Sequence, residues 1–304
     1  MKCSKCQRKA VIFVRYGGYH LCSHHFTESV LKRVKKELRN QFKLRKLKIA
    51  VGVSGGKDSL LTLYLLAEIF KNNPDVEIEA ICVDEGIKGY RDKSIPFVEK
   101  MCKKVEVPFH LVSFRKMVGY ELDTIAQIAE EKTPCSYCGV FRRLCLNRKS
   151  KEIGATYLAV GLNLDDVAQT IFMNFARADI KKLARLGPHK IKKEGLVPRI
   201  LPLRQIPEQE SFLFCVLKGI DFYHGECPYA YKAHRGLFRE LLGRLEMNTP
   251  GTRHAFLRIY DTLYDSIIKK EPPASLKICE KCGEPSSGTV CKTCLFLEEV
   301  KKKF

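Results

Sequence analysis

Cysteine and histidine side chains are grouped near both ends of the chain, in spacings typical of zinc ligands. The first group is Cys3-x₂-Cys6, followed after fifteen residues by Cys22-x₂-His25. The second group is Cys279-x₂-Cys282, followed after eight residues by Cys291-x₂-Cys294. A pair of ligands two residues apart forms a tight knuckle, and two such pairs complete a tetrahedral shell. A closed shell leaves no position for a substrate, so we expect two structural Zn²⁺ sites.

Two alternatives exist for these groups. His24 could replace His25 as a ligand, although the two-residue offset from Cys22 favours His25. Each group could instead form disulfides. No secretory signal is visible at the N-terminus, so we expect a reducing, cytoplasmic location, and this disfavours disulfides.

A third set of cysteines has a different spacing. Cys135 and Cys138 form an isolated pair, and Cys227 follows about ninety residues later in Gly-Glu-Cys-Pro-Tyr. Three thiolates with an open fourth position suit a [4Fe–4S] cluster, and a redox pair that carries a persulfide is the alternative that residue chemistry leaves open. Plain core cysteines fit poorly, because Pro134 and Gly139 indicate a turn around the pair. The other four cysteines are expected to be small buried hydrophobes: Cys82, Cys102, Cys145 and Cys215.

The string Ser54-Gly-Gly-Lys-Asp-Ser59 joins a predicted strand to a predicted helix and has the composition of a phosphate-binding loop. Its glycines let the backbone approach an anion, and the N–H groups at a helix N-terminus attract that anion. Its lysine adds a positive charge, and its serine hydroxyls can donate hydrogen bonds to the same oxygens. It is not a Walker loop, because Val51 stands where that motif needs Gly and Asp58 follows the lysine. An ordinary glycine turn is the alternative.

A second polar string, Gly161-Leu-Asn-Leu-Asp-Asp-Val-Ala-Gln-Thr170, follows another predicted strand. Carboxylates of Asp165 and Asp166 that face the phosphate loop would suit Mg²⁺ coordination or activation of a nucleophile. The alternative is that these carboxylates cap the N-terminus of the following helix.

These strings lie between apolar runs whose period alternates between strand and helix. Strands are predicted at 48–53, 78–83, 109–114 and 156–161. Helices are predicted at 27–42, 60–70, 92–104, 142–152, 165–178, 208–218, 232–246 and 252–269, with an irregular segment at 188–207. Strands that alternate with helices of ~10–15 residues indicate an α/β fold, with a parallel sheet and helices on both of its faces.

Composition and net charge limit the classes of function that this chain can have. The chain has 304 residues and a net charge of +20, which favours a polyanionic partner, with nucleic acid first and an anionic membrane surface second. A hydrophobic fraction of 45% excludes a disordered chain, and no apolar run approaches the ~20 residues of a membrane span. We expect three parts: an N-terminal zinc module (1–26), a catalytic domain (27–270) and a C-terminal zinc module (271–304).

The phosphate loop resembles the S-G-G-x-D-S string of the N-type ATP pyrophosphatases, or PP-loop proteins, which have an adenine nucleotide alpha-hydrolase-like fold. The string at 161–170 follows the same family's pattern, which favours a functional role over helix capping for Asp166. The resemblance implies that ATP is cleaved between its α- and β-phosphates with Mg²⁺ and that an acceptor oxygen is adenylated. Adenine would lie against the backbone near Val53 and 81–83. The implied nucleotide-binding residues are Val53, Ser54, Gly55, Gly56, Lys57, Asp58, Ser59, Ile81, Arg142, Gly161 and Asp166, of which Asp58, Arg142 and Asp166 would be catalytic.

Taken together and in this order, the motifs resemble those of the tRNA 2-thiouridine synthetases of the TtuA type and their archaeal and eukaryotic wobble-uridine relatives. This resemblance spans essentially the whole chain. It implies that ATP adenylates the uracil 2-oxygen of a tRNA and that sulfur then displaces AMP. It implies that Cys135, Cys138 and Cys227 hold a [4Fe–4S] cluster, and that Arg142 or Arg143 lies near the α-phosphate. It also implies a ubiquitin-like sulfur carrier with a C-terminal thiocarboxylate, and a homodimer.

Other functions are less consistent with the motifs. The same fold could use a cysteine persulfide, or could thiolate another tRNA base such as cytidine. A non-catalytic RNA-binding zinc protein would not need the phosphate loop and Asp166 together. Candidate tRNA contacts, each equally consistent with a solvated helix residue, are Tyr229, Tyr231, His234, Arg235 and Arg253.

Overall fold

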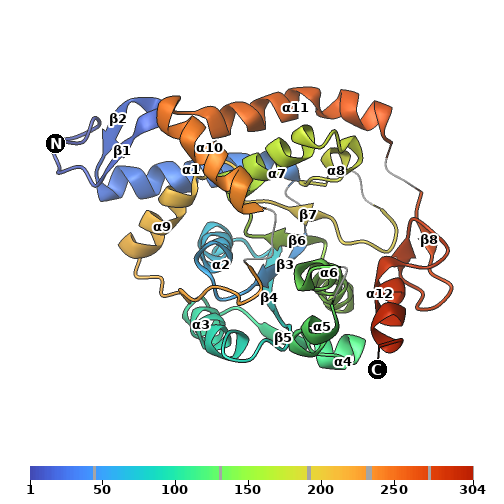
Figure 1. The fold of residues 1–304 in the computed structure, drawn as a ribbon. Helices are drawn as coiled ribbons and strands as arrows, with labels where there is room; N and C mark the ends of the chain where they lie inside the picture. The colour runs from blue at the N-terminus through green and yellow to red at the C-terminus, as the bar shows by residue number, and fades with distance from the viewer. Residues whose placement is uncertain (44–45, 130–131, 190–192, 231–234, 273–274, 304) are drawn as a thin grey trace.

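A computed structural model describes residues 1–43, 46–129, 132–189, 193–230, 235–272 and 275–303 (Figure 1). A central sheet is enclosed by helices, and the N-terminal and C-terminal modules lie at opposite ends of the molecule. No helix in the described part of the chain is both long enough and apolar enough to cross a bilayer.

Five parallel strands form the central sheet. They are β3 (Leu47–Val53), β4 (Val76–Asp84), β5 (Phe109–Ser113), β6 (Tyr157–Val160) and β7 (Arg199–Ile200). Their spatial order is β5-β4-β3-β6-β7, and every neighbouring pair is parallel. The strand order reverses between β3 and β6, and ligands of open α/β sheets bind beyond the carboxyl ends of the strands at such a point. The predicted phosphate loop and the string at 161–170 both follow strands at this position.

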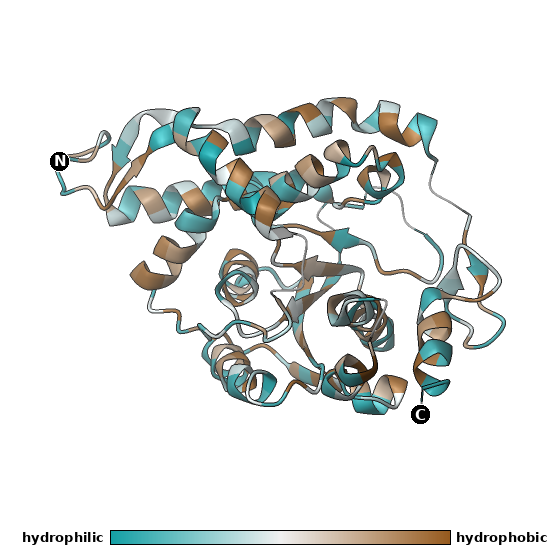
Figure 2. Cartoon of the chain, in the orientation of Figure 1, coloured by the Kyte–Doolittle hydropathy of each residue, from teal (hydrophilic) through white to brown (hydrophobic). Residues whose placement is uncertain are grey.

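Helices cover both faces of the sheet, as the sequence predicts. One buried apolar cluster packs α1 (Ser23–Gln41), α2 (Lys57–Phe70), α3 (Arg91–Lys104) and α9 (Glu208–Leu217) on one face. A second cluster packs α4 (Phe114–Val118), α5 (Leu122–Ile128), α6 (Pro134–Glu152) and α12 (Lys292–Lys301) on the other face. Brown, hydrophobic residues are concentrated on the strands and on the sides of the helices that face them (Figure 2).

A third apolar cluster extends the structure beyond the sheet. It joins α7 (Leu164–Ala176) and α8 (Ile180–Ala184) to α11 (Thr252–Lys270). The helix α10 (Arg235–Asn248) contacts α7 and α11. Phe172 of α7 contacts Phe238 of α10, with ring centroids 5.4 Å apart, and Phe256 of α11, with ring centroids 5.3 Å apart.

The terminal modules are small and are attached by both apolar and polar contacts: Val14 and Leu21 belong to the first apolar cluster, and Phe296 and Val300 belong to the second. The N-terminal module contains β1 (Ile12–Val14), the 3₁₀ helix η1 (Arg15–Gly17) and β2 (Tyr19–Leu21), and the C-terminal module contains β8 (Lys277–Ile278), β9 (Pro285–Ser286) and α12. The Tyr16 hydroxyl donates to Glu210 Oε1 of α9 at 2.6 Å. Glu284 of the other module pairs with Arg148 of α6, with 2.7 Å between Oε1 and Nε. Each module is therefore joined to the central domain through a buried or half-buried carboxylate.

The long elements of the central domain agree with the predictions, whereas its short elements and α12 of the C-terminal module were not predicted. The four predicted strands correspond to β3, β4, β5 and β6. The sequence did not indicate α4, α5, α8 or β7, which are two to seven residues long and carry too few residues to show a period. The four cysteines predicted to be core residues are at most 3% exposed.

Candidate active site at the carboxyl end of the sheet

The phosphate loop turns sharply between β3 and α2. Gly56 is the N-cap of α2, and Gly55 has a φ of +84°. A Cβ at Gly55 would lie 2.4 Å from the carbonyl oxygen of Ser94. Only glycine fits this combination of positive φ and close approach. The strand–loop–helix arrangement predicted from the sequence is present.

Hydrogen bonds within the loop fix its curvature. The Ser54 N–H donates to Ser59 Oγ at 3.0 Å, and the Ser59 hydroxyl donates to the Gly56 carbonyl at 2.9 Å. The loop is anchored to a neighbouring segment because the Tyr223 N–H donates to the Gly55 carbonyl at 2.9 Å. The α2 N-terminus therefore has a preformed cradle of the kind that binds phosphate.

Charged groups of the loop suit a phosphate with a divalent cation. Lys57 Nζ lies 2.8 Å from Asp58 Oδ2 and 2.8 Å from Glu208 Oε1. Asp58 Oδ1 is buried, and no residue in the described ranges donates a hydrogen bond to it. A buried carboxylate oxygen without a donor is costly unless a cation or water binds it, and carboxylate oxygens are the ligands that Mg²⁺ prefers. Asp58 is therefore a candidate ligand for the Mg²⁺ that the resemblance implies, a role that the sequence analysis considered for Asp165 and Asp166.

The end of β6 packs directly against this loop. A Cβ at Gly161 would lie 2.7 Å from the Asp58 carbonyl oxygen. Gly161 therefore allows the string at 161–170 to touch the start of α2. In contrast, Ile81 lies inside the sheet, fully buried, with register partners on both sides. Val53 is the last residue of β3 and is 4% exposed.

The two aspartates of the string at 161–170 make structural contacts. Asp166 forms a capping box with Asn163, because each side chain accepts a hydrogen bond from the other residue's N–H. Asp165 accepts from the Glu208 N–H at 2.8 Å, and its Oδ1 lies 3.0 Å from Arg253 Nε. Capping, which the family pattern disfavoured, is thus one role of Asp166. Arg253 contacts Asp165 and so holds α11 against α7.

Cys135 and Cys138 lie within the first five residues of α6, so the predicted turn around this pair is wrong. Pro134 is the first residue of the helix, where its fixed φ and missing N–H are favourable. The sequence signal that we interpreted as a turn is therefore a helix start. The helix places both thiols near its N-terminus.

Cys227 is brought to this helix end from a distant part of the chain. Cys227 packs against the apolar cluster that contains Cys138, and the Cys135 thiol donates to the Tyr229 carbonyl at 3.5 Å. The Tyr229 hydroxyl in turn donates to Asp123 Oδ1 at 2.7 Å. Tyr231 and His234 lie outside the described residues, as does the side chain of Arg235.

The environment of these thiols suits ligands of a metal cluster. Burial raises the pKa of Cys138 to about 11, and burial, then the Cys227 thiol, raises the pKa of Cys135. A metal ligand must be a thiolate, so binding of a metal at these residues would be coupled to loss of their protons. Within the described residues, the sulfur atoms of Cys135, Cys138 and Cys227 do not all lie within 4.8 Å of one another. A wider spacing is expected when each cysteine binds a different iron of a cluster.

A buried carboxylate connects the thiols to the phosphate loop. Arg142 Nη2 donates to Cys138 Sγ at 3.0 Å, and Arg142 Nε lies 2.8 Å from Glu85 Oε1. The other oxygen of Glu85 accepts from Arg91 Nε at 2.5 Å, and Arg91 Nη1 donates to the Ser54 carbonyl at 2.7 Å. Glu85 and Arg91 are 1% and 3% exposed. The chain Cys138–Arg142–Glu85–Arg91–Ser54 therefore joins the two predicted sites.

Sequence analysis missed Glu85 and Arg91. The available signal was the acidic residue that follows β4 directly, at the same edge of the sheet as the phosphate loop. Between the two arginines considered for the α-phosphate, Arg142 faces this site. Arg143 lines a different cavity, between α6 and the C-terminal module.

Both terminal groups have the geometry of a tetrahedral metal site. In the N-terminal group, Cys3 Sγ and Cys22 Sγ lie 3.4 and 3.5 Å from His25 Nδ1, and the Cys6–Cys22 sulfurs are 3.8 Å apart. Sulfur distances in the C-terminal group are 3.9 Å for Cys279–Cys294 and 3.5 Å for Cys282–Cys291. With Zn–S bonds of about 2.3 Å, a tetrahedral edge is ~3.8 Å, whereas a disulfide is near 2.05 Å. The donors therefore fit zinc, with His25 as the fourth N-terminal ligand.

Comparisons with known families and proteins agree with this geometry. The PP-loop domain family matches residues 25–245, and the N-terminal LIM domain of 2-thiouridine synthetase TtuA matches residues 2–27. The chain belongs to the PP-loop family. The tRNA 2-thiolation protein NcsA of Haloferax volcanii is 36% identical, over 99% of both chains. The tRNA-5-methyluridine(54) 2-sulfurtransferase of Pyrococcus horikoshii is 33% identical, over 97% of this chain and 93% of its own.

One solved structure of a PP-loop protein is similar over nearly the whole chain. It is the U34-tRNA thiolase NcsA from Methanococcus maripaludis with its [4Fe–4S] cluster. The TM-score is 0.85 at 36% identity, over 98% of this chain and 96% of that chain. The PP-loop fold and the arrangement of its elements are therefore shared with a protein that holds an iron–sulfur cluster.

The Glu85 connection yields a prediction for this PP-loop protein. Glu85→Gln keeps the shape of the side chain but leaves the buried Arg91 without a carboxylate. Removing one partner of a buried ion pair costs about 3–5 kcal/mol, so we expect a loss of that size in the free energy of unfolding, measured by urea denaturation. Glu121→Gln is the matched control, because its pair with Arg115 is exposed and such pairs contribute at most about 1 kcal/mol. Equal stability of the two variants would contradict a structural role for Glu85.

Proposed function

We propose that this protein is an ATP-dependent tRNA uridine 2-sulfurtransferase. The observation that carries the proposal is the connection, through Arg91, Glu85 and Arg142, between the PP-loop and Cys138, a thiol near Cys135 and the distant Cys227. The similarity to NcsA over 99% of the chain supports both the substrate and the cluster. The net charge of +20 suits a tRNA, whose phosphates are neutralised by Lys and Arg.

Residues of the PP-loop would bind the nucleotide. Backbone N–H groups at the α2 N-terminus and the Lys57 ammonium would hold the β- and γ-phosphates, as Lys57 exchanges its contacts with Asp58 and Glu208 for phosphate oxygens. Asp58 would bind Mg²⁺ through its unpartnered oxygen, and this ion would neutralise charge on the leaving pyrophosphate. Adenine would contact the strand ends near Val53, since Ile81 lies inside the sheet.

Two substitutions make up the proposed reaction. The uracil O2 attacks the α-phosphorus, the bond from this phosphorus to the bridging oxygen breaks, and pyrophosphate leaves with that oxygen. Sulfur then attacks C2, and AMP leaves with the former O2. Adenylation is needed because a carbonyl oxygen is a poor leaving group and a phosphate ester is a good one. Arg142, 45% exposed beside Cys138, would stabilise charge on the α-phosphate.

Cys135, Cys138 and Cys227 would hold the cluster. When bound, the cluster supplies an iron without a protein ligand, which can carry sulfide. Arg142 donates to Cys138 and would orient this ligand and offset its negative charge. Asp166 would perform its implied catalytic role while it remains in the capping box, where Asn163 holds it at the start of α7.

Partners and location are proposed on the family resemblance. The sulfur source would be a ubiquitin-like carrier with a C-terminal thiocarboxylate. The cytoplasm is proposed because relatives carry the name cytoplasmic tRNA 2-thiolation protein 1, including one from Caenorhabditis elegans that is 34% identical over 97% of this chain. The three parts of the chain would be a zinc module (1–26), the PP-loop domain (27–270) and a second zinc module (271–304).

The first test is product analysis with anaerobically prepared protein, ATP, sulfide and unmodified tRNA. We expect AMP, pyrophosphate and 2-thiouridine, with nuclease mapping to show whether position 34 or 54 is thiolated. Asp58→Asn should lower the rate by about a hundredfold or more, because it removes the cation ligand. Cys138→Ala should lose thiolation but retain ATP binding, whereas Cys145→Ala on the same helix should keep both. ADP and phosphate as products, or full activity of Cys138→Ala, would contradict the proposal.

Metal analysis tests the assignment of the three cysteine groups. We expect about four iron and about two zinc atoms per chain. Cys227→Ala should remove iron and leave zinc, while Cys294→Ala should remove about one zinc and leave iron. Thiolation by an iron-free protein would favour the persulfide mechanism instead.

A homodimer would use the outer faces of α10 and α11. Large apolar side chains there are exposed, and Leu237, Leu241 and Leu245 repeat every four residues along α10. This apolar stripe forms a face of α10 against which a second copy of the chain can pack. Light scattering should give twice the chain mass of 34.8 kDa, and Leu241→Glu should reduce it to a single mass. A monomeric wild-type protein would contradict the dimer.

A further inference from the structure

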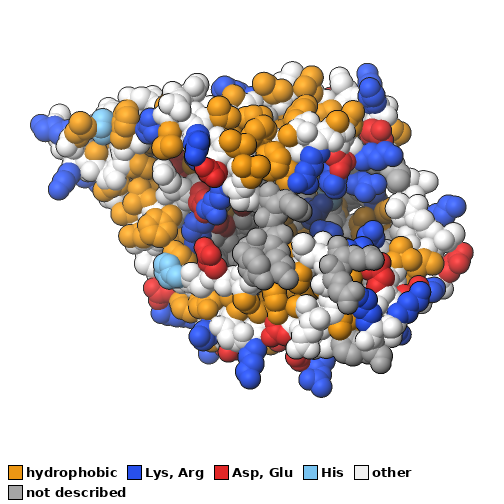
Figure 3. Space-filling model, viewed as in Figure 1, with side chains coloured by type: hydrophobic (Ala, Val, Ile, Leu, Met, Phe, Trp, Pro, Cys, Tyr) orange, Lys and Arg blue, Asp and Glu red, His pale blue; other side chains and the backbone are white. Residues whose placement is uncertain are grey.

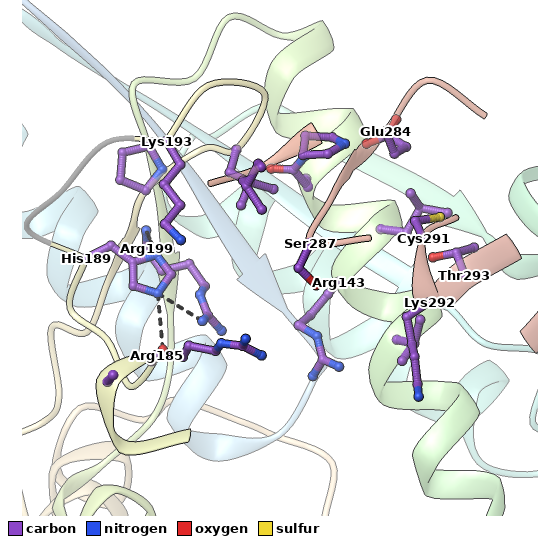
Figure 4. A pocket seen from close by; sticks show the side chains of 18 of the residues that line it. Arg143, Arg185, His189, Lys193, Arg199, Glu284, Ser287, Cys291, Lys292 and Thr293 are labelled. Carbon is purple, nitrogen blue, oxygen red and sulfur yellow. Dashed lines mark hydrogen bonds between the residues drawn. The ribbon is translucent and has the colours of Figure 1, made fainter. Parts of the chain in front are cut away.

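A cavity outside the site described above lies between the central domain and the C-terminal module. Its volume is about 410 Å³, and its walls come from α6, α8, the segment before β7, α11 and the start of α12. Arg185, His189 and Arg199 form one wall and Lys292 belongs to the opposite wall, with Arg143 between them (Figure 4). The cavity is large enough for a nucleotide-sized group, since small-molecule sites span roughly 300–1,000 Å³.

The cavity is built by specific contacts. Asn147 of α6 donates to the Gly195 carbonyl at 3.0 Å and accepts from the Val197 N–H at 2.9 Å. A Cβ at Gly195 would lie 2.3 Å from Cγ of Pro285, so this segment packs closely against the C-terminal module. The pair Arg148–Glu284 holds the same module to α6. The module therefore completes a wall of the cavity.

Positive charge in the cavity has little compensation from the protein. Glu284 is the one acidic residue among those that line it, and Arg148 already pairs with this carboxylate. Within the described ranges, no Asp or Glu pairs with Arg143, Arg185 or Arg199. Space-filling side chains of Lys and Arg surround a hollow beside α8 and the C-terminal module (Figure 3).

Burial makes this uncompensated charge costly. Burial, and then the nearby Arg143, lower the pKa of Arg199 to about 10. Burial, and then Arg199, lower the pKa of His189 to about 4, so His189 is neutral at physiological pH. Arg199 is half-buried, whereas Arg143 and Arg185 are exposed. A half-buried guanidinium group without a carboxylate calls for an anion from outside. Guanidinium forks match the geometry of phosphate oxygens, which favours a phosphate group.

The position of the cavity relates it to the candidate active site. Arg142 and Arg143 are consecutive on α6, so they leave the helix about 100° apart. Arg142 reaches Cys138 and Glu85, whereas Arg143 reaches the cavity. A helix with its side chains is about 10 Å wide, so a nucleic-acid strand that crosses α6 can contact both.

We propose that this cavity binds a phosphate-bearing nucleotide of the substrate RNA, on a different face of α6 from the uridine that is modified. The inference rests on the proposed function and adds a second contact site to it. Tyr264 and Leu144 provide apolar walls against which the sugar or base can pack. The C-terminal zinc module acquires a role as one wall of an RNA site.

The test measures binding of an unmodified tRNA transcript to the metal-loaded full-length protein at several salt concentrations. Arg185→Gln/Arg199→Gln should weaken binding about tenfold and lower the slope of log K against log salt by about 1–2, because phosphate contacts are lost. The single variant Arg199→Lys keeps the positive charge and should retain most of the wild-type salt dependence. The control Arg115→Gln/Lys116→Gln removes two exposed charges at α4 and should behave as the wild type. ATP binding should be the same in all four proteins, which shows that the variants are folded.

Other outcomes of the binding experiments would overturn the inference or the proposed function, or would assign the cavity to another occupant. An unchanged slope in Arg185→Gln/Arg199→Gln overturns the inference while the proposed function stands. Failure of the wild-type protein to bind tRNA overturns the proposed function itself. Titration with AMP distinguishes a free nucleotide from the RNA strand: AMP binding that is lost in the double variant, with unchanged tRNA binding, would reassign the cavity to the product. Loss of thiolation only when a carrier protein supplies the sulfur, with unchanged tRNA binding, would reassign it to that protein.

Discussion

The buried carboxylate of Glu85 fixes the distance between the two halves of the candidate active site. One of its oxygens pairs with Arg91, which holds the carbonyl of Ser54 in the phosphate loop, and the other pairs with Arg142, which donates to Cys138. A carboxylate that is 1% exposed is stable only if it is paired, and here two guanidinium groups pair with it. Two guanidinium groups and one carboxylate have a net positive charge. Solvent can stabilise this charge because Arg142 is partly exposed. A shift of either half would break this arrangement.

The strand order makes this arrangement possible. β3 and β4 are adjacent, so the phosphate loop after β3 and Glu85 after β4 emerge at the same edge of the sheet. The start of α6 lies on the face of the sheet covered by the second apolar cluster, with Cys227 packed against it. Gly161 then allows the end of β6 to approach the loop from the other side. The fold thus brings a nucleotide-binding loop and three thiols together although they are distant in sequence.

Much of this could be predicted from the sequence, and the rest depends on contacts between distant residues. Strings such as Ser54–Ser59 carry a local signal, because glycines and a helix start are required at fixed positions. The two terminal groups are equally local, and their donors lie at zinc-like distances. Glu85 carries only the weak signal of an acidic residue directly after a strand, and its ion pair with Arg91 is visible only after folding. The turn predicted at Pro134 is wrong because proline is as favourable at the first position of a helix as in a turn.

In the proposed enzyme, the nucleotide and the iron–sulfur cluster occupy one site, on either side of Arg142. Anomalous diffraction at the iron absorption edge, from crystals of the anaerobic protein soaked with a non-hydrolysable ATP analogue, measures this directly. We expect one iron peak bordered by Cys135, Cys138 and Cys227, with the α-phosphate of the analogue against Arg142. An iron peak at a terminal module, or a triphosphate bound away from the loop at 54–59, would contradict it.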